Sequence, residues 1–349
     1  METISKYGRG IYYRKGVVAH KGNQCHKNLI YPLLKFETCI FPVFFVDSII
    51  MSEIPTHIVR DLQKLDSRYL VKIIFFILIY ILSILIVLCF ISVFKNSGLV
   101  FAIPFYILAG ASMHGICLFT HEGVHGTIHR NILVNNFIGS ISGYIVLQTM
   151  AGYRVLHLKH HKHLNMDGDP GLLQTYTSNK FIIAAMEWGY LLFGYIAFLS
   201  IIPYQGFKQG TKKDKLLIIK DLFFIVLFLY FILFLLPPLW FLHCWLIPMV
   251  FVHFMMNIRG MSQHLMLEDH HDPYLGARTI KAHPIVDFFL CNENYHIEHH
   301  LYPSIPWYNL KKVHLHIEKN LFEKQSIIIF SFKQFLKEFV NKSFKEIRA

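Results

Sequence analysis

Long uninterrupted runs of apolar residues dominate the pattern along this chain. Four of them reach about 20 residues, the length at which an α-helix crosses the hydrocarbon core of a bilayer. These runs lie at 70–94, 99–120, 216–236 and 240–258, and their few charged residues stand near the ends. A buried helix of a soluble protein is rarely so long and so apolar, so the pattern predicts an integral, multi-pass membrane protein.

Two short breaks pair these runs. The segment KNSG at 95–98 separates the first two, and Pro237 with Pro238 separates the last two. Each pair is therefore predicted to form a transmembrane hairpin whose outer ends lie on the same side of the membrane. The expected fold class is all-α integral membrane, with two transmembrane helical hairpins (four spans), interfacial helices and a cytoplasmic histidine-rich cap.

Two further segments, 132–153 and 181–204, are only partly apolar. The first contains Asn135 and Gln148, and the second contains Glu187 near its start. By composition either segment can span the membrane or lie in its interface. We expect both to lie in the interface or to re-enter, because a single extra crossing would divide the histidines described below between the two sides.

The same pattern suggests three parts of the chain. Residues 1–69 are expected to form a cytoplasmic or interfacial N-terminal segment, 70–320 the membrane domain, and 321–349 a cytoplasmic C-terminal tail. Within the first part, the apolar run 40–51 is short and is interrupted by a proline and an aspartate. It therefore fits an interfacial segment better than a span.

The charge distribution indicates which side of the membrane the loops face. Only 16% of the residues are charged, but the formal net charge is +12. Lysine and arginine crowd between and after the apolar runs, and by the positive-inside rule these loops face the cytoplasm and anionic head groups. Examples are Arg60, Lys64, Arg68, Lys208, Lys212, Lys213 and Lys215. A nucleic-acid site would place basic residues along a soluble face, so we expect membrane lipids and no nucleic acid as partners.

Three histidine clusters follow the apolar runs, all on the face assigned to the cytoplasm. The first is HEGVH at 121–125, whose two histidines share a helix face because they are four residues apart. The second, HLKHH at 157–161, and the third, HIEHH at 296–300, both follow the pattern HxxHH, which gathers three rings on one helical turn. The eight histidines are His121, His125, His157, His160, His161, His296, His299 and His300.

A ninth candidate ligand is His264, in RGMSQH just after the last apolar run. His253 stands eleven residues earlier and fits a histidine packed inside the helix bundle. The histidines at 129, 163, 270 and 271 fit ordinary polar loops. Eight or nine imidazoles are too many for one metal ion, whereas two ions would receive four or five nitrogens each. Imidazole suits Zn, Cu, Fe and Ni alike, so the residues alone do not name the metal.

Acidic residues near the clusters can orient the rings. Ligating histidines usually donate their second ring N–H to a carboxylate or carbonyl. The acids in question are Glu122, Asp167, Asp169, Glu293 and Glu298. For any single one of them, a solvated acid on a loop or helix face is the better interpretation.

The three histidine boxes, set around two membrane hairpins, resemble those of the membrane fatty acid desaturase and hydroxylase superfamily. The likeness covers roughly 70–320 and extends into two further stretches, LNMDGDP at 164–170 and NYHIEHHLYPSIPWYNL at 294–310. The resemblance implies a non-haem centre of two iron ions held by the eight histidines and His264. It also implies O₂ as co-substrate and electrons from an external donor.

The resemblance also implies a reaction that attacks an unactivated C–H bond of a fatty acyl chain. We expect this reaction to be desaturation. Hydroxylation or ketolation of a lipid, sphingolipid or carotenoid on the same scaffold is the alternative. The substrate is expected as an acyl-lipid, acyl-CoA or acyl carrier protein. The enzyme would be an O₂-dependent oxidoreductase in a bacterial inner membrane or the endoplasmic reticulum, with its active site facing the cytoplasm.

Two differences from the stearoyl-CoA type of this superfamily bear on which group carries the acyl substrate. The stearoyl-CoA type has asparagine where this chain has Gly260, and its first box is one residue longer than HEGVH. The spacing here is closer to that of acyl-lipid desaturases. The chain also lacks the HPGG signature of a fused haem domain, so a separate donor such as ferredoxin or a cytochrome is implied.

Two other classes of protein remain as alternatives. HEGVH also fits HExxH, the zinc-protease signature, but a protease would leave both HxxHH clusters without a role. A metal transporter would place polar ligands at mid-membrane, where these spans offer only His114, His243 and His253. The ratio of bound iron to bound zinc separates all three classes.

Overall fold

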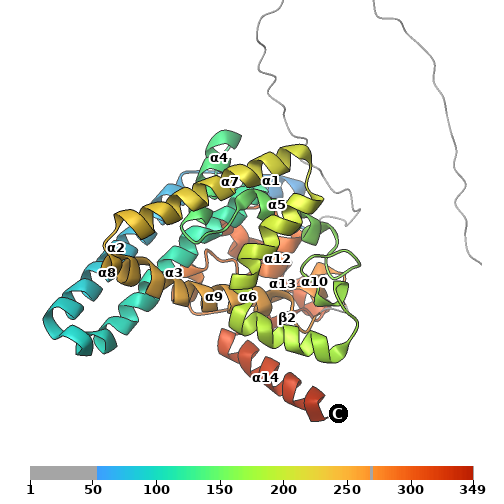
Figure 1. Cartoon of the computed structure of the whole chain (residues 1–349). Helices are drawn as coiled ribbons and strands as arrows, with labels where there is room; N and C mark the ends of the chain where they lie inside the picture. The colour runs from blue at the N-terminus through green and yellow to red at the C-terminus, as the bar shows by residue number, and fades with distance from the viewer. Residues whose placement is uncertain (1–52, 268–269, 349) are drawn as a thin grey trace, which may run out of the picture. The chain divides into compact units, whose positions relative to one another are not determined.

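The computed structural model describes residues 53–267 and 270–348, and most of them are helical, as predicted (Figure 1). The apolar run 40–51 and most of the segment 1–69 lie outside the described residues. Helix α1 (Thr56–Leu62) is the first described element.

The helices of both expected pairs are present in the predicted order. The first consists of α2 (Arg68–Phe94) and α3 (Gly98–His125), joined by the turn η1 (Lys95–Ser97). The second breaks at Pro237 and its elements are α7 (Lys212–Tyr230), η3 (Phe231–Leu235), α8 (Pro238–Trp240), η4 (Phe241–Leu246) and α9 (Ile247–His264). Helices α3 and α9 extend beyond the predicted spans, and this extension places the first histidine box and His264 on rigid helical ends.

Within the described residues, five helices are long and apolar enough to cross a membrane, one more than the four predicted. The additional helix is α6 (Lys180–Gln209), which covers the segment 181–204 that the sequence left open. Large apolar side chains are exposed along these helices, as expected of a surface that meets lipid rather than water. Examples are Phe75, Leu82, Phe101, Phe193, Phe223 and Phe234.

The segment 132–153 forms no single span. It divides between α4 (Ile132–Tyr144) and the start of α5 (Met150–Lys162), each of 13 residues. A helix of that length measures about 20 Å, too short for a hydrocarbon core of about 30 Å. The length of these two helices agrees with the prediction that segment 132–153 does not cross the membrane as one helix.

Helix α3 lies at the centre of the bundle and packs against α2, α4 and α9. Its close approach to α9 depends on Gly110, because a Cβ atom there would lie 2.7 Å from Phe251 Cβ and 2.9 Å from the Pro248 carbonyl oxygen. The side chain of Phe76, from α2, is fully buried between α3 and the residues that follow α9.

The chain after α9 folds back over the helix ends. Its elements are α10 (Pro273–Gly276), β1 (Arg278–Ile280), α11 (Pro284–Phe289), α12 (His296–Leu301), η5 (Trp307–Asn309), α13 (Leu310–Glu323), β2 (Ile327–Ile329) and α14 (Phe332–Arg348). Strands β1 and β2 pair in parallel, with Thr279 opposite Ile328. The Ile280 N–H donates to the Asn294 carbonyl (2.8 Å), which fixes the chain just before α12. The boundary predicted at 320 falls inside α13, and α14 buries Phe335 against the bundle.

We expect Gly110→Ala to lower the melting temperature of the detergent-purified protein, because the added methyl group separates α3 from α9. Overpacking of this kind costs about 1–3 kcal/mol. The matched control is Gly189→Ala in α6, where nothing lies within 4 Å of the added Cβ. Thermal unfolding followed by circular dichroism measures both, and equal melting temperatures for the two variants would contradict the packing argument.

Candidate metal centre

The structure brings all nine predicted histidines together in two adjacent groups. The five-histidine cluster consists of His121, His125, His157, His161 and His299. The four-histidine cluster consists of His160, His264, His296 and His300. Within each cluster, the candidate ligand atoms all lie within 4.8 Å of one another. The helices that carry them are α3, α5, α9 and α12.

Each HxxHH box contributes to both clusters. In α5, His157 and His161 belong to the five-histidine cluster and His160 to the other; in α12, the first and last histidines belong to the four-histidine cluster and His299 to the other. Successive helical residues turn by about 100°, so residue i+4 lies about 40° to one side of residue i and i+3 about 60° to the other. One helical turn therefore points its rings at two neighbouring positions.

The ring nitrogens of the five-histidine cluster converge. His157 Nε2 lies 2.9 Å from His125 Nε2 and 3.0 Å from His161 Nε2, and His299 Nε2 lies 3.0 Å from His161 Nε2. The ring centroid of His121 is 4.5 Å from that of His299, and its buried Nε2 has no hydrogen-bond partner among the described residues.

The four-histidine cluster is equally tight. His264 Nε2 lies 2.9 Å from His296 Nε2, 3.1 Å from His160 Nε2 and 3.2 Å from His300 Nε2. The two clusters touch, because the rings of His161 and His300 stack with their centroids 4.2 Å apart.

The spacing and orientation of these ring nitrogens are suited to binding metal ions. His264 Nδ1 faces the Gly276 carbonyl (2.9 Å) and His160 Nδ1 faces Asp169 Oδ1 (2.9 Å), so both rings direct their N–H away from the cluster. In the neutral rings both Nε2 atoms then carry lone pairs, which repel at 3.1 Å unless a cation lies between them. Two nitrogens bound at about 2.1 Å to one ion, at a right angle, are about 3 Å apart.

Two of the five acidic residues orient ligand rings. Asp169 accepts from His160, as described, and Glu293 Oε1 lies 3.0 Å from His121 Nδ1. Glu122 is buried and lies farther from the same ring, with its Oε1 3.8 Å from His121 Nδ1, while its Oε2 accepts from the Thr127 hydroxyl (2.7 Å) and the Trp307 N–H (3.1 Å). The other two acids face no ring of either cluster: Glu298 pairs with His314 and Thr279, and Asp167 is exposed.

Asp169 also shapes the loop LNMDGDP. Its carboxylate accepts the N–H groups of Asn165 (2.8 Å) and Gly171 (2.7 Å), and Gly168 supplies the positive φ of 86° that the turn requires. Burial alone would raise the pKa of Asp169, but the hydrogen bonds from His160 and these amides lower it below its usual value. The acid is therefore ionised and holds His160 in one orientation.

The electrostatic environment keeps five of the nine rings neutral. Burial, followed by the neighbouring histidines, lowers the pKa of five rings well below its usual value of 6.5. These rings are His157, His161, His296, His299 and His300. A neutral imidazole is the form that binds a metal ion, so at neutral pH these five rings need not lose protons before binding.

The remaining histidines lie outside both clusters. His253 Nε2 faces the Leu192 carbonyl (2.7 Å), and it packs within the bundle, as the sequence suggested. His129, His163, His270 and His271 also lie outside the metal-binding groups found in the described part of the chain.

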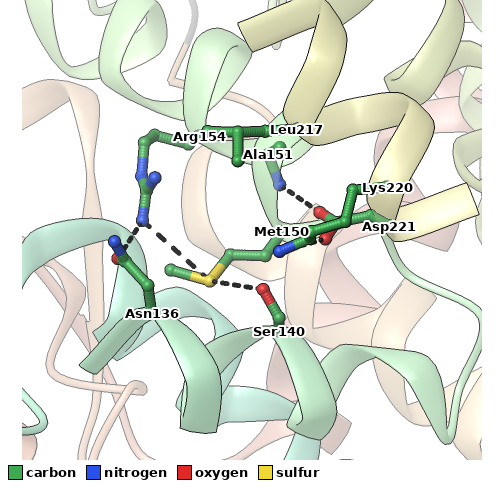
Figure 2. Close-up of a pocket in the computed structure, with 8 residues that line it drawn as sticks. All are labelled: Asn136, Ser140, Met150, Ala151, Arg154, Leu217, Lys220 and Asp221. Carbon is green, nitrogen blue, oxygen red and sulfur yellow. Dashed lines mark hydrogen bonds and ion pairs between the residues drawn. The ribbon is translucent and has the colours of Figure 1, made fainter. Parts of the chain in front are cut away.

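Sequence reasoning missed the hydrogen bonds that connect α5 to α4 and α7, several of which Figure 2 shows. Asp221 of α7 is fully buried; its Oδ2 accepts the Ala151 N–H (2.8 Å) at the start of α5, and its Oδ1 accepts the Tyr144 hydroxyl (2.7 Å). Arg154 Nη2 donates to Asn136 Oδ1 (2.7 Å) of α4. A carboxylate inside an apolar run is costly in a membrane unless it is paired. The position of Asp221 in such a run was therefore a sequence signal that it has hydrogen-bond partners.

Arg154 links α5 to the first box as well. Its Nη2 lies 3.4 Å from the carbonyl oxygen of Gly123, which stands between the two histidines of that box. A cavity of about 30 Å³ lies beside Arg154, which is room for water rather than for a lipid (Figure 2). Its lining includes Asn136, Ser140, Met150, Arg154, Lys220 and Asp221. The cavity and its polar side chains therefore serve to position α5.

We predict that Asp221→Ala lowers both the melting temperature and the metal bound per chain, measured by mass spectrometry of the purified protein. The change leaves the Ala151 N–H and the Tyr144 hydroxyl unpaired, at a cost of about 1–3 kcal/mol, and frees α5 to move. The control is Lys220→Met, which removes only a half-exposed ion-pair partner of Asp221. Normal metal content in Asp221→Ala would rule out this positioning role.

Comparison with known proteins identifies the family of this chain. A family model described as fatty acid desaturase matches residues 96–333. The chain is 25% identical over 242 residues to an sn-1 oleoyl-lipid 12-desaturase of Picosynechococcus sp., a match covering 62% of this chain and 69% of that protein. It is 24% identical to the chloroplastic omega-6 fatty acid desaturase of Arabidopsis thaliana, covering 62% and 54%. A stretch of 57 residues is 42% identical to a zeaxanthin 4-ketolase of Chlamydomonas reinhardtii, covering 16% and 12%. The chain therefore belongs to the fatty acid desaturase family.

Proposed function

We propose that this protein is a membrane desaturase that introduces a double bond into the acyl chain of a lipid. It would use O₂, two iron ions and electrons from a separate donor. The observation that carries this proposal is the pair of touching histidine clusters with five and four converging nitrogens. One ion per cluster uses all nine rings, and membership of the desaturase family favours iron over the other metals that imidazole accepts.

The iron pair, when bound, would supply the O₂ activation by which an unactivated C–H bond is broken. The chain's own residues position and shield that chemistry. Asp169 and Glu293 hold the outer nitrogens of His160 and His121, so these rings keep one orientation. Helix α12 is buried over all five residues from His296 to His300, which excludes bulk water from the clusters.

Two observations bear on the substrate. The matched relatives are named as desaturases of an oleoyl-lipid and of fatty acids, which supports an acyl-lipid here. The short match to a zeaxanthin ketolase supports ring oxidation of a carotenoid as the second candidate on the same scaffold. A zinc protease is not supported, because it would leave both HxxHH boxes without a role, whereas their six histidines all belong to the two clusters.

We further propose that only four of the five candidate helices cross the membrane and that α6 lies in the interface. His125 Nε2 meets His157 of α5, and His264 Nε2 meets His160 of the same helix, so α3 and α9 end on one side. The chain between them must therefore cross an even number of times. At the end of α6, Gln209 Oε1 accepts from Lys159 Nζ (2.9 Å) of α5, which keeps that end beside the histidines.

This topology predicts the labelling of single cysteines by a membrane-impermeant maleimide in a cysteine-free background. Ser97→Cys and Leu236→Cys, in the two hairpin turns, should react from outside intact cells. Thr211→Cys, between α6 and α7, should react only in inside-out vesicles, because it lies on the histidine side. Labelling of Thr211→Cys from outside would show that α6 spans the membrane.

The activity itself is tested by mass spectrometry of lipids from cells that express the chain. We expect acyl groups lighter by two hydrogens, and their loss to background in His300→Ala and His161→Ala, because each removes one ligand from one cluster. His316→Ala, on the exposed side of α13, is the matched control and should keep full activity. Products heavier by one oxygen would instead make the enzyme a hydroxylase, and full activity of both ligand variants would remove the metal-site assignment.

A further inference from the structure

Glu298 is an acidic residue of the third histidine box to which the proposed metal chemistry gives no role. It lies in α12 between His296 and His299, and its side chain is fully buried. Because successive helical residues turn by about 100°, Glu298 points about 160° away from both His296 and His300. A buried carboxylate on that face of the helix is costly unless it is paired. Its partners therefore indicate what it does.

Both oxygens of the Glu298 carboxylate are hydrogen-bonded to buried side chains of other elements. Oε2 accepts from the Thr279 hydroxyl (2.6 Å) of β1, and Oε1 accepts from His314 Nδ1 of α13. His314 Nε2 is buried and has no hydrogen-bond partner among the described residues, so the bond to Glu298 is the polar contact that this ring contributes there. The carboxylate thus joins α12 to one element before it in the chain and one after it.

These two elements are fixed through contacts that involve none of the nine histidines. Strand β1 pairs with β2, and its Ile280 carbonyl accepts from Asn294 Nδ2 (2.6 Å). Helix α13 buries Val313 and Ile317 in an apolar cluster that also contains Ile297 of α12. Strand β1 and helix α13 therefore form a support for α12.

Helix α12 needs such a support because it has only six residues. An isolated helix shorter than about 12 residues is marginal in water, so tertiary contacts must set its orientation. The packing of Ile297 restricts how far the helix can move, but apolar contacts are not directional. Two hydrogen bonds to one carboxylate are directional, so they also define the rotation of the helix about its axis. That rotation decides which ring faces which cluster.

We propose that Glu298, held by Thr279 and His314, is a positioning residue for both metal ions. Its two hydrogen bonds fix α12 at the rotation at which His299 joins the five-histidine cluster while His296 and His300 join the four-histidine cluster. The inference rests on the proposed function, in which each cluster binds one ion. Glu298 acts only through the three rings, because its carboxylate oxygens are engaged on the other side of the helix.

The test is the metal affinity of the purified full chain, measured by titration with Co²⁺ against a competing chelator. Co²⁺ accepts imidazole ligands, and its visible spectrum reports how they are arranged. Loss of an outer partner of metal-ligating histidines lowers affinity about 10–100-fold. We expect Glu298→Ala to weaken both ions by about this factor, because its helix supplies ligands to both clusters. His264→Ala, which removes a ligand of the four-histidine cluster alone, should weaken mainly one ion.

Matched variants separate each hydrogen bond from the volume of the side chain. Thr279→Val keeps the volume and loses the hydroxyl, so it should weaken both ions, whereas Thr279→Ser should bind them nearly as the wild type does. His314→Leu should weaken both ions as well, and His314→Asn, which still offers an N–H to Glu298, should recover part of the affinity. His316→Ala, on the exposed side of the same helix, is the control that should change nothing.

A purely structural effect is distinguished by Val313→Ala, which leaves a cavity in the core beside His314. This variant should lower the melting temperature without changing the affinity for Co²⁺ at a temperature where the chain is folded. Equal losses of affinity in Val313→Ala and Thr279→Val, at equal melting temperatures, would overturn the positioning role.

The proposal is also overturned if folded Glu298→Ala keeps both ions at wild-type affinity or weakens only one of them. Where that variant does not fold, Thr279→Val decides by the same criterion. Failure of the proposed function is distinct. A wild type that binds two ions but makes no unsaturated product contradicts the desaturase and leaves the positioning role standing, whereas a wild type that binds fewer than two ions contradicts the two-ion centre and this inference together.

Discussion

The repulsion among imidazole lone pairs is the interaction on which the rest of this structure depends. Nine rings point their Nε2 atoms into two adjacent positions, and pairs of these atoms approach to 2.9–3.2 Å. Neutral rings at that distance repel one another unless a cation is shared. Burial keeps five of these rings neutral, and it removes the water that would otherwise separate the nitrogens. The fold therefore holds an arrangement that is unfavourable by itself and becomes favourable with a metal ion in each cluster.

That arrangement requires rigid supports from several directions. Each HxxHH turn serves both clusters, so a small rotation of α5 or α12 would disturb two metal positions together. Asp169 and Glu293 fix individual rings, whereas Asp221 and Arg154 fix α5 as a whole through contacts with α7 and α4. Polar groups inside an apolar bundle are costly when unpaired, and their pairing here makes the position of the helix stiff.

The same reasoning applies to two interior arginines. Arg154 donates to Asn136, and Arg278 donates to the carbonyl oxygens of Ser262 and Leu265, so both guanidinium groups are paired within the fold.

The sequence by itself determined the features that depend on local order along the chain. Run length predicted the hairpins, and the i, i+3, i+4 spacing of the boxes identified eight candidate ligands, with His264 added from its place after the last run. Only the tertiary structure decided how these rings divide into five and four, because that division depends on how α3, α5, α9 and α12 meet. It also decided which of the acids face rings, the role of Asp221, and the continuous α6 that composition had left open. Contacts between elements a hundred residues apart, such as His160 with His264, leave no periodic trace in the sequence, since each partner's side chain obeys only the geometry of its own helix.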